Sequence, residues 1–483
     1  MKLLRHLAGY LPVNIANAVA AFGGVYVFTR LLDADDYGRY ALMVSAMALI
    51  HTLSLTPAEA AAYRFAGKAG AEGKLPDHFR TALSLTFRSL LVTAALIIAL
   101  GTALNQLPDY LAILPWIAIL MPMNTVIQMT LESHKAGQQV GRYAFVETTR
   151  LIGGFLIGTL VAWQTGMGAA CPFIGMVVVG AMLVAPQGLW LSKQAKTGKT
   201  SPKQRQAYLA YGIPIAAALV LDLILSAADR FLIALFLGEA AVGEYAAGYG
   251  VADKTVLLLC AWAAMAGSPL VMAAYERAGR EAARDEARGM ITTMLLIGIP
   301  AATGLALVAR PLAEAMIGAE VREGALQIIP WIAFAGLLNG LLIHYFSEAF
   351  QLAHKTTERA LLMLIPAGAN IILNLILIPQ FALMGAVIAT IASYALGVAV
   401  LGLRGRRHVA LPMPVLEIAK ISVAALAMWP ILMLVPEWGS WPELFTKAIL
   451  GGVTYIIIAF LLDAGGARAF VQERISSKSE KAA

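Results

Sequence analysis

The sequence predicts an all-α polytopic membrane protein with about fourteen transmembrane helices, arranged as two six-helix lobes and two C-terminal helices. Its composition, its long apolar stretches and an internal repeat support this prediction. Of its 483 residues, 59% are hydrophobic and only 13% are charged, whereas soluble domains carry about 25% charged residues. So few charges cannot cover a water-facing surface of this size, which excludes a soluble enzyme, a disordered chain and a disulfide scaffold.

Apolar stretches long enough to cross a bilayer recur along the whole chain. A spanning helix needs about 20 predominantly apolar residues, and no stretch alternates as a barrel strand does. The first stretch continues past the length of a cleavable signal and lacks an A-x-A site. The predicted spans are 9–29, 39–57, 82–104, 111–131, 144–164, 168–191, 208–237, 243–270, 290–309, 325–350, 360–379, 383–403, 415–436 and 445–463.

The distribution of basic residues predicts the orientation of these spans. Lys and Arg gather in alternate loops, and cytoplasmic loops are the ones that carry such an excess. The loops on the opposite side hold only Arg30, Arg39, Arg310 and Arg322. We therefore expect both termini in the cytoplasm and 58–81 as the longest cytoplasmic loop. A basic face beside anionic lipid explains the net charge of +7, so no nucleic-acid partner is expected.

Two segments of the chain repeat each other. LLDADDYGRYA (31–41) aligns with FLGEAAVGEYA (236–246), and each forms the first outer hairpin of a six-helix set. Parallel repeats of this kind are typical of transporters that work by alternating access, although chance similarity between apolar helices is the alternative. The predicted parts are an N-terminal lobe, a C-terminal lobe, two further helices and a cytoplasmic tail, at 1–207, 208–412, 413–463 and 464–483.

Sequence signatures of catalysis and of cofactor binding are missing. The chain has no G-x-x-x-x-G-K-[ST], H-E-x-x-H or G-x-S-x-G motif, and its loops are too short for a catalytic domain. Cys171 and Cys260 both lie within predicted spans, where we expect small packed apolar residues. We therefore expect no catalytic residue, no bound metal and no cofactor, apart from a coupling proton or sodium ion.

Three segments resemble a known family. FTRLLDADDYGRYAL (28–42), SAADRFLIALFLGEAAVGEYAAGYGVADK (226–254) and NIILNLILIPQFALMGAVIATIASY (370–394) are similar to the polysaccharide transporter family. These are Wzx-type flippases of the multidrug/oligosaccharidyl-lipid/polysaccharide (MOP) superfamily, and the resemblance covers roughly 1–405. It implies translocation of a polyprenyl-pyrophosphate-linked oligosaccharide across the bacterial inner membrane for cell-surface polysaccharide such as lipopolysaccharide. It also implies partners in the same pathway, namely a polysaccharide polymerase and chain-length proteins.

Basic residues within the predicted spans are candidates for binding the substrate's pyrophosphate. Charges inside a membrane are costly and usually face a cavity or a partner, and the arginine fork binds phosphate oxygens in bidentate fashion. For Arg150 a local pair with Glu147 is the alternative, and Arg88 can instead extend to the inner surface. The predicted cationic cavity consists of Arg230, Lys254, Arg88 and Arg150.

Acidic residues within spans are candidates for ion coupling. Asp222 has no basic neighbour within a turn of its own helix, whereas Asp229 and Asp253 each precede a basic residue. A neutral, hydrogen-bonded carboxylic acid is the alternative for Asp222. Ion pairs across the hairpin, Asp229 with Lys254 or Arg230 with Asp253, are the alternative for the others. His51 and His344 also titrate in a useful range, although polar packing is the commoner role.

Two amides complete the predicted polar cavity. Asn370 and Asn374 are four residues apart and share one helical face, where they can hydrogen-bond to another helix or to sugar hydroxyls. The overall prediction is an ion-coupled flippase that is not an enzyme. A MATE-like drug/cation antiporter is the nearest alternative. A membrane-embedded polysaccharide polymerase or glycosyltransferase is the alternative from another class.

Overall fold

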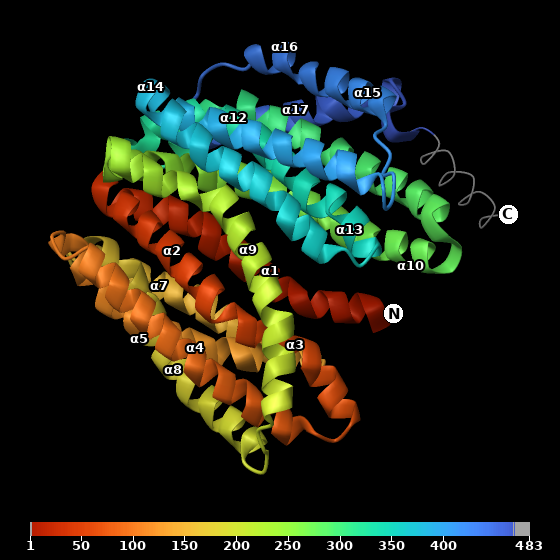
Figure 1. Cartoon of the computed structure of the whole chain (residues 1–483). Coiled ribbons are helices and arrows are strands. Elements are labelled where there is room, and N and C mark those ends of the chain that lie inside the picture. Colours follow the sequence, from red (N-terminus) through yellow and green to blue (C-terminus); the bar gives the residue numbers. More distant parts are fainter. Residues whose placement is uncertain (1, 467, 469–483) are drawn as a thin grey trace. The chain divides into compact units, whose positions relative to one another are not determined.

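The chain folds into helices from end to end of its described part, which comprises residues 2–466 and residue 468 of a computed structural model (Figure 1). No β-strand occurs among these residues. The predicted tail 464–483 falls almost wholly outside them. The helices of the first half are α1 (Lys2–Leu31), α2 (Ala34–Ser54), α3 (Thr56–Ala71), α4 (Leu75–Ala103), α5 (Pro108–Ala136), α6 (Val140–Thr148), the π-helix η1 (Thr149–Gly153), α7 (Gly154–Gln164), α8 (Cys171–Ala195) and α9 (Pro202–Leu237).

The second half contains the two longest helices. Its elements are α10 (Glu239–Leu307), α11 (Ala309–Met316), α12 (Arg322–Leu341), the π-helix η4 (Leu342–Phe346), α13 (Glu348–Leu352), α14 (Thr356–Gly405), α15 (Val415–Leu426), α16 (Met428–Met433) and α17 (Ser440–Leu461). The chain divides into two compact units, Met1–Gly243 and the part from Glu244 onward. The predicted lobe boundary at 207/208 comes from the repeat and stays a prediction.

Within the described residues, eleven helices are long and apolar enough to cross a membrane, or twelve if the bent pair α2–α3 is one span. The protein is therefore a multi-pass membrane protein. Helix α10 has 69 residues, which at about 1.5 Å each would exceed the roughly 30 Å hydrocarbon core threefold. It breaks at Gly279, where φ is 81°, and α14 breaks at Ala382. Each holds two of the predicted stretches, and the total of fourteen crossings stays a prediction.

Large apolar side chains cover much of the outside of the long helices. Trp163 is 72% exposed and Leu235 is 71% exposed. Soluble monomers rarely expose such side chains over large contiguous areas. In this chain they are the surface that meets lipid.

Close contacts between helices of the first unit depend on glycine. A Cβ added at Gly175 of α8 would lie 2.2 Å from the backbone nitrogen of Gly158 in α7. A Cβ at Gly212 of α9 would lie 2.0 Å from the carbonyl oxygen of Pro57 in α3. Small residues let membrane helices approach backbone to backbone. The second contact fixes α9 beside the junction of α2 and α3.

The two copies of the repeat lie in the predicted outer hairpins, and they contact each other in the structure. Asp33 caps α2 by accepting a hydrogen bond from the backbone nitrogen of Asp36 at 2.7 Å. A Cβ added at Gly38 would lie 1.8 Å from the carbonyl oxygen of Glu239, the first residue of α10. The Tyr110 hydroxyl donates to the same Glu239 at 3.1 Å. The first repeat motif therefore contacts the start of the second one.

The segment 58–81 differs from its prediction as a loop. It holds most of α3 and the start of α4. Its sequence AEAAAYRFAGKAGA is rich in alanine, the best helix former, and Ala58, Ala61 and Ala62 are buried. Phe65 stacks on Tyr208 of α9 at 4.6 Å between ring centroids. Local propensity and packing against α9 make this stretch helical despite its charges.

Within the second unit, hydrogen bonds of tyrosine side chains join the helices to one another, in addition to apolar packing. Tyr249 of α10 and Tyr394 of α14 share a hydrogen bond of 3.0 Å, and both side chains are buried. Tyr455 of α17 donates to the carbonyl oxygen of Leu296 in α10 at 2.8 Å. This bond attaches the C-terminal helices to α10.

Candidate functional site

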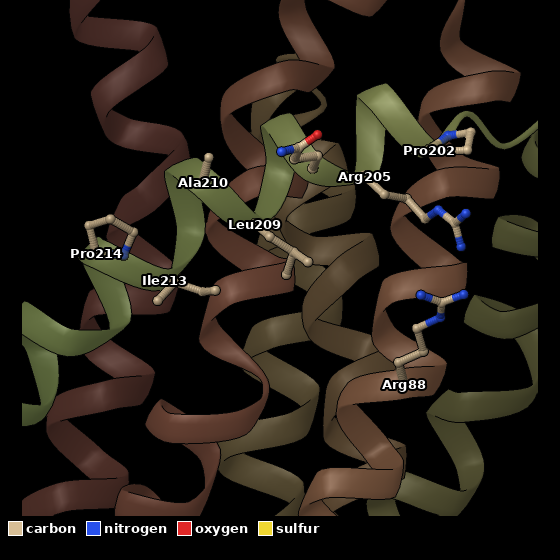
Figure 2. Close-up of a pocket in the computed structure, with 8 residues that line it drawn as sticks. Arg88, Pro202, Arg205, Leu209, Ala210, Ile213 and Pro214 are labelled. Carbon is tan, nitrogen blue, oxygen red and sulfur yellow. The ribbon is translucent and has the colours of Figure 1, made fainter.

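Two arginines of the first unit face each other across a cavity of about 560 Å³. Arg88 comes from α4 and Arg205 from the first turn of α9, and Figure 2 shows their guanidinium groups pointing toward each other. Pro202 starts α9 with the fixed φ that suits the first position of a helix, and Arg205 follows one turn later among the residues that line the cavity. The remaining lining is mostly apolar, from Pro202, Leu209, Ala210, Ile213 and Pro214, together with Gln206.

The charge of this cavity is uncompensated by protein groups. No carboxylate lines it, and neither Arg88 nor Arg205 forms an ion pair with any residue that the structure describes. Arg88 is exposed and Arg205 is half-buried. Two converging guanidinium groups repel each other unless an anion lies between them. Their paired forks suit a phosphate or pyrophosphate, which accepts several charge-assisted hydrogen bonds. We call Arg88 and Arg205 the arginine pair.

Arg88 was predicted as a site residue and Arg205 was missed. Arg205 lies in the segment 192–207. From the sequence alone, its charge counts only as one of the cytoplasmic charges that set the orientation. Its spacing of three residues after Pro202, at a helix start that follows the N-cap Ser201, is the signal that places it on α9. Nothing in the sequence indicates that α4 and α9 lie side by side at this point.

Arg230 lies elsewhere in the first unit. It donates from a guanidinium nitrogen to the Ser45 hydroxyl of α2 at 3.1 Å. The preceding Asp229 is 1% exposed, and its carboxylate accepts a hydrogen bond from the Arg230 backbone nitrogen at 2.8 Å. Arg230 therefore connects α9 to α2 by a polar contact within the membrane. Its role in substrate binding stays a prediction.

Arg150 forms the local pair that the sequence offered as the alternative. It donates twice to Glu147, at 2.9 and 2.7 Å. The pair borders a second cavity of about 370 Å³, which we call the polar pocket, lined by Met47, Ala48, His51, Thr52, Met121, Asn124, Gln128 and Arg150. A guanidinium already held in bidentate fashion has fewer donors left for a substrate.

The predicted acids and Lys254 are divided between the two units. Asp222 and Asp229 belong to the first unit, and Asp222 is half-buried. Asp253 and Lys254 belong to the second unit, where Asp253 is 4% exposed and accepts from Asn339 at 3.5 Å. Lys254 is exposed. The pairing across the hairpin would join the units and stays a prediction, as does ion coupling by these acids.

Asn370 and Asn374 are fully buried in α14. The Asn374 amide donates to the Asn370 carbonyl oxygen at 2.8 Å and to its side-chain oxygen at 3.1 Å. The Asn370 side-chain nitrogen and the Asn374 side-chain oxygen have no hydrogen-bond partner among the described residues. The two amides thus bond along their own helix, and two of their polar atoms remain available.

The remaining polar chemistry gives no sign of a metal or redox centre. Cys171 and Cys260 are free and buried. Within residues 2–466 and 468, no group of three or more His, Cys, Asp or Glu side chains is placed to hold a metal ion. The candidate site of the first unit is therefore the open, cationic cavity of the arginine pair.

Comparison with known proteins identifies the family. Residues 3–270, more than half of the chain, match the family described as "Polysaccharide biosynthesis protein". The chain belongs to this family. It is also 23% identical over 402 residues to the "Probable low-salt glycan biosynthesis flippase Agl15" of Haloferax volcanii, covering 82% of each chain.

Several solved structures share the fold, among them a flippase and a multidrug transporter. The lipid II flippase MurJ, in its inward closed conformation, matches with a TM-score of 0.74 at 16% identity, over 95% of this chain and 99% of MurJ. An inward-facing MATE family multidrug transporter of the MOP superfamily matches with a TM-score of 0.56 at 13% identity, over 82% of this chain and 93% of that one. These relatives are flippases and transporters, which confirms the prediction that the chain is not an enzyme. The family match confirms the predicted family, and the two structures show that the chain shares their fold.

Proposed function

We propose that this protein is a flippase that moves a polyprenyl-pyrophosphate-linked oligosaccharide from the cytoplasmic to the periplasmic leaflet. The arginine pair carries this proposal, because two unpaired guanidinium groups in one cavity suit a pyrophosphate. Membership of a polysaccharide biosynthesis family and the printed names of the relatives support a lipid-linked glycan as substrate.

The position of the arginine pair fits the loading step. Arg205 lies at the start of α9, within the segment 192–207 that is predicted to be cytoplasmic. Arg88 lies six residues inside the predicted span 82–104, about 9 Å from the start of that span at 1.5 Å per residue. A headgroup entering from the cytoplasmic leaflet would meet this cavity first. Arg230 and Lys254 would bind it later, when the cavity opens to the other side.

The full transport cycle belongs to the same proposal. The two units alternate between inward and outward openings, and a proton or sodium gradient drives the cycle through Asp222, Asp229 or Asp253. The protein lies in a bacterial inner membrane with both termini in the cytoplasm. It supplies substrate to a polysaccharide polymerase and its chain-length proteins for surface polysaccharide such as lipopolysaccharide.

A MATE-like antiporter for organic cations is the competing function, and its fold is shared. The arginine pair argues against it, since an organic cation would be repelled by both guanidinium groups and would find no carboxylate in that cavity. This charge argument favours an anionic substrate.

Reconstitution distinguishes the two functions. Purified protein in liposomes is given a fluorescent polyprenyl-pyrophosphate oligosaccharide, and its movement is followed by accessibility to an external glycosidase. We expect protein-dependent movement, and no gradient-driven efflux of ethidium from the same vesicles. Efflux of ethidium without movement of the lipid would make the antiporter the better description.

A further inference from the structure

His51 of α2 and Glu59 of α3 contact each other across a break in the helix. The imidazole nitrogen and the carboxylate oxygen are 2.9 Å apart. Helices α2 and α3 bend by 55° at Leu55, and Pro57 lacks the amide that would continue the helical bonding there. In an unbent helix these residues would lie about 12 Å apart along the axis. The contact between them therefore depends on the bend.

The two side chains differ in their access to water. Glu59 is 8% exposed, and its second carboxylate oxygen is buried without a hydrogen-bond partner among the described residues. The His51 side chain is 31% exposed and lines the polar pocket together with Thr52, Asn124 and Gln128. A proton can thus reach the imidazole from the pocket, while the carboxylate stays shielded.

The charged groups that η1, α6 and α5 bring near the contact are paired with each other. Arg150 of η1 faces His51 across the polar pocket and is neutralised by Glu147 of α6. From α5, Gln128 donates to Glu132, which pairs with Lys135 at 2.9 Å.

From α4, the uncharged Thr93 lies 2.8 Å from Ser54. Helix α9 runs along the same stretch, from Gly212 beside Pro57 to Arg230 on Ser45, and its charged groups there are the half-buried Asp222, the buried Asp229 and Arg230 itself. With a neutral imidazole, Glu59 therefore holds a buried charge that a single proton would balance. Histidine is the side chain that takes up such a proton near neutral pH.

We propose that His51 and Glu59 form a proton-binding site of the first unit, and that the bound proton holds the bend between α2 and α3. With the proton on the imidazole, an ion pair spans the break. When the proton leaves through the polar pocket, the ion pair is replaced by a hydrogen bond from a neutral imidazole to the carboxylate, which is weaker, and the junction relaxes toward a straighter helix. A role of this site in coupling proton movement to transport rests on the proposed flippase function. The proton-dependent bend itself does not.

The distance between a label on α2 and a label on α3 tests the proposal, and its measurement requires no transport assay. Spin labels are placed at Asp35→Cys on α2 and Lys68→Cys on α3, two exposed positions, after both buried cysteines are changed to alanine. The full chain is studied in lipid nanodiscs by double electron–electron resonance at mildly acidic and mildly alkaline pH. We expect one short distance at acidic pH and a shift to longer, broader distances at alkaline pH.

Three variants make the result specific. Glu59→Gln removes the partner charge and should abolish the pH response, while His51→Arg should keep the short distance at every pH. Thr52→Ala, beside His51 in the same pocket, should respond as the wild type does. A wild-type distance that ignores pH, or a Glu59→Gln variant that keeps the full response, would overturn the proposal.

The flippase function fails separately from this inference. A pH-dependent distance in a protein that moves no lipid would reject the proposed function and leave the proton site standing. Lipid movement together with a pH-independent distance would do the reverse.

Discussion

At the scale of single residues, the chemistry of the candidate site depends on which charges have partners. Arg150 is neutralised by Glu147, and Arg230 donates to Ser45, whereas Arg88 and Arg205 have no ion-pair partner within the described part of the chain. Sequence reasoning found the in-span arginines because charges in apolar stretches are conspicuous. It missed Arg205, since a charge outside the predicted spans is indistinguishable from any other cytoplasmic charge.

The fork geometry of Arg88 is open to a direct test. Arg88→Lys keeps the charge and loses bidentate contact with phosphate oxygens. Charge-assisted hydrogen bonds contribute about 1.5–3 kcal/mol, so the half-saturating lipid concentration for movement should rise about ten- to a hundredfold. Titration of the lipid in proteoliposomes measures this, with Lys203→Arg, in the first turn of α9 but outside the cavity lining, as control. An unchanged concentration dependence would remove Arg88 from the binding site.

Asp222 is predicted to couple an ion to transport. Asp222→Asn keeps the size of the side chain and removes its titratable group. Lipid movement should then lose its dependence on an imposed proton or sodium gradient, although movement down the lipid's own gradient continues. Gradient dependence equal to that of the wild type would exclude this role.

At the scale of helices, apolar length predicts where they form and small residues decide how they pack. Every predicted stretch coincides with one helix or with a run of two or three adjoining helices, to within three residues at its ends. The unpredicted helix α3 arises because alanine-rich sequence and packing against α9 outweigh the charges that suggested a loop. The breaks at Gly279 and Ala382 fall between predicted stretches, whereas the approach of Gly212 to Pro57 depends on a tertiary contact that no local pattern encodes.

The α7–α8 contact gives a stability prediction. Gly175→Ala places a Cβ 2.2 Å from the backbone of α7, and overpacking of this kind costs about 1–3 kcal/mol. The melting temperature in detergent should therefore fall. Gly368→Ala in α14, where a Cβ meets nothing within 4 Å, should leave it unchanged or raise it through better helix propensity. Equal effects of both variants would show that the glycine contact is unimportant.

At the scale of the whole molecule, charge asymmetry predicts an orientation that the structure leaves open. Gln106 lies between α4 and α5 on the predicted outer side, and Thr200 lies between α8 and α9 on the predicted inner side; both are exposed. In intact cells, a membrane-impermeant maleimide should label Gln106→Cys and spare Thr200→Cys until the membrane is permeabilised. The opposite pattern would invert the topology and place the arginine pair on the wrong face for loading.

The central claim is that the arginine pair binds the pyrophosphate of a lipid-linked oligosaccharide during its translocation. Its most direct test is lipid movement by the double variant Arg88→Ala/Arg205→Ala in proteoliposomes, beside Lys203→Ala. We expect the double variant to lose movement almost completely while its melting temperature stays near that of the wild type, and Lys203→Ala to remain active. Wild-type movement by a folded double variant would contradict the account.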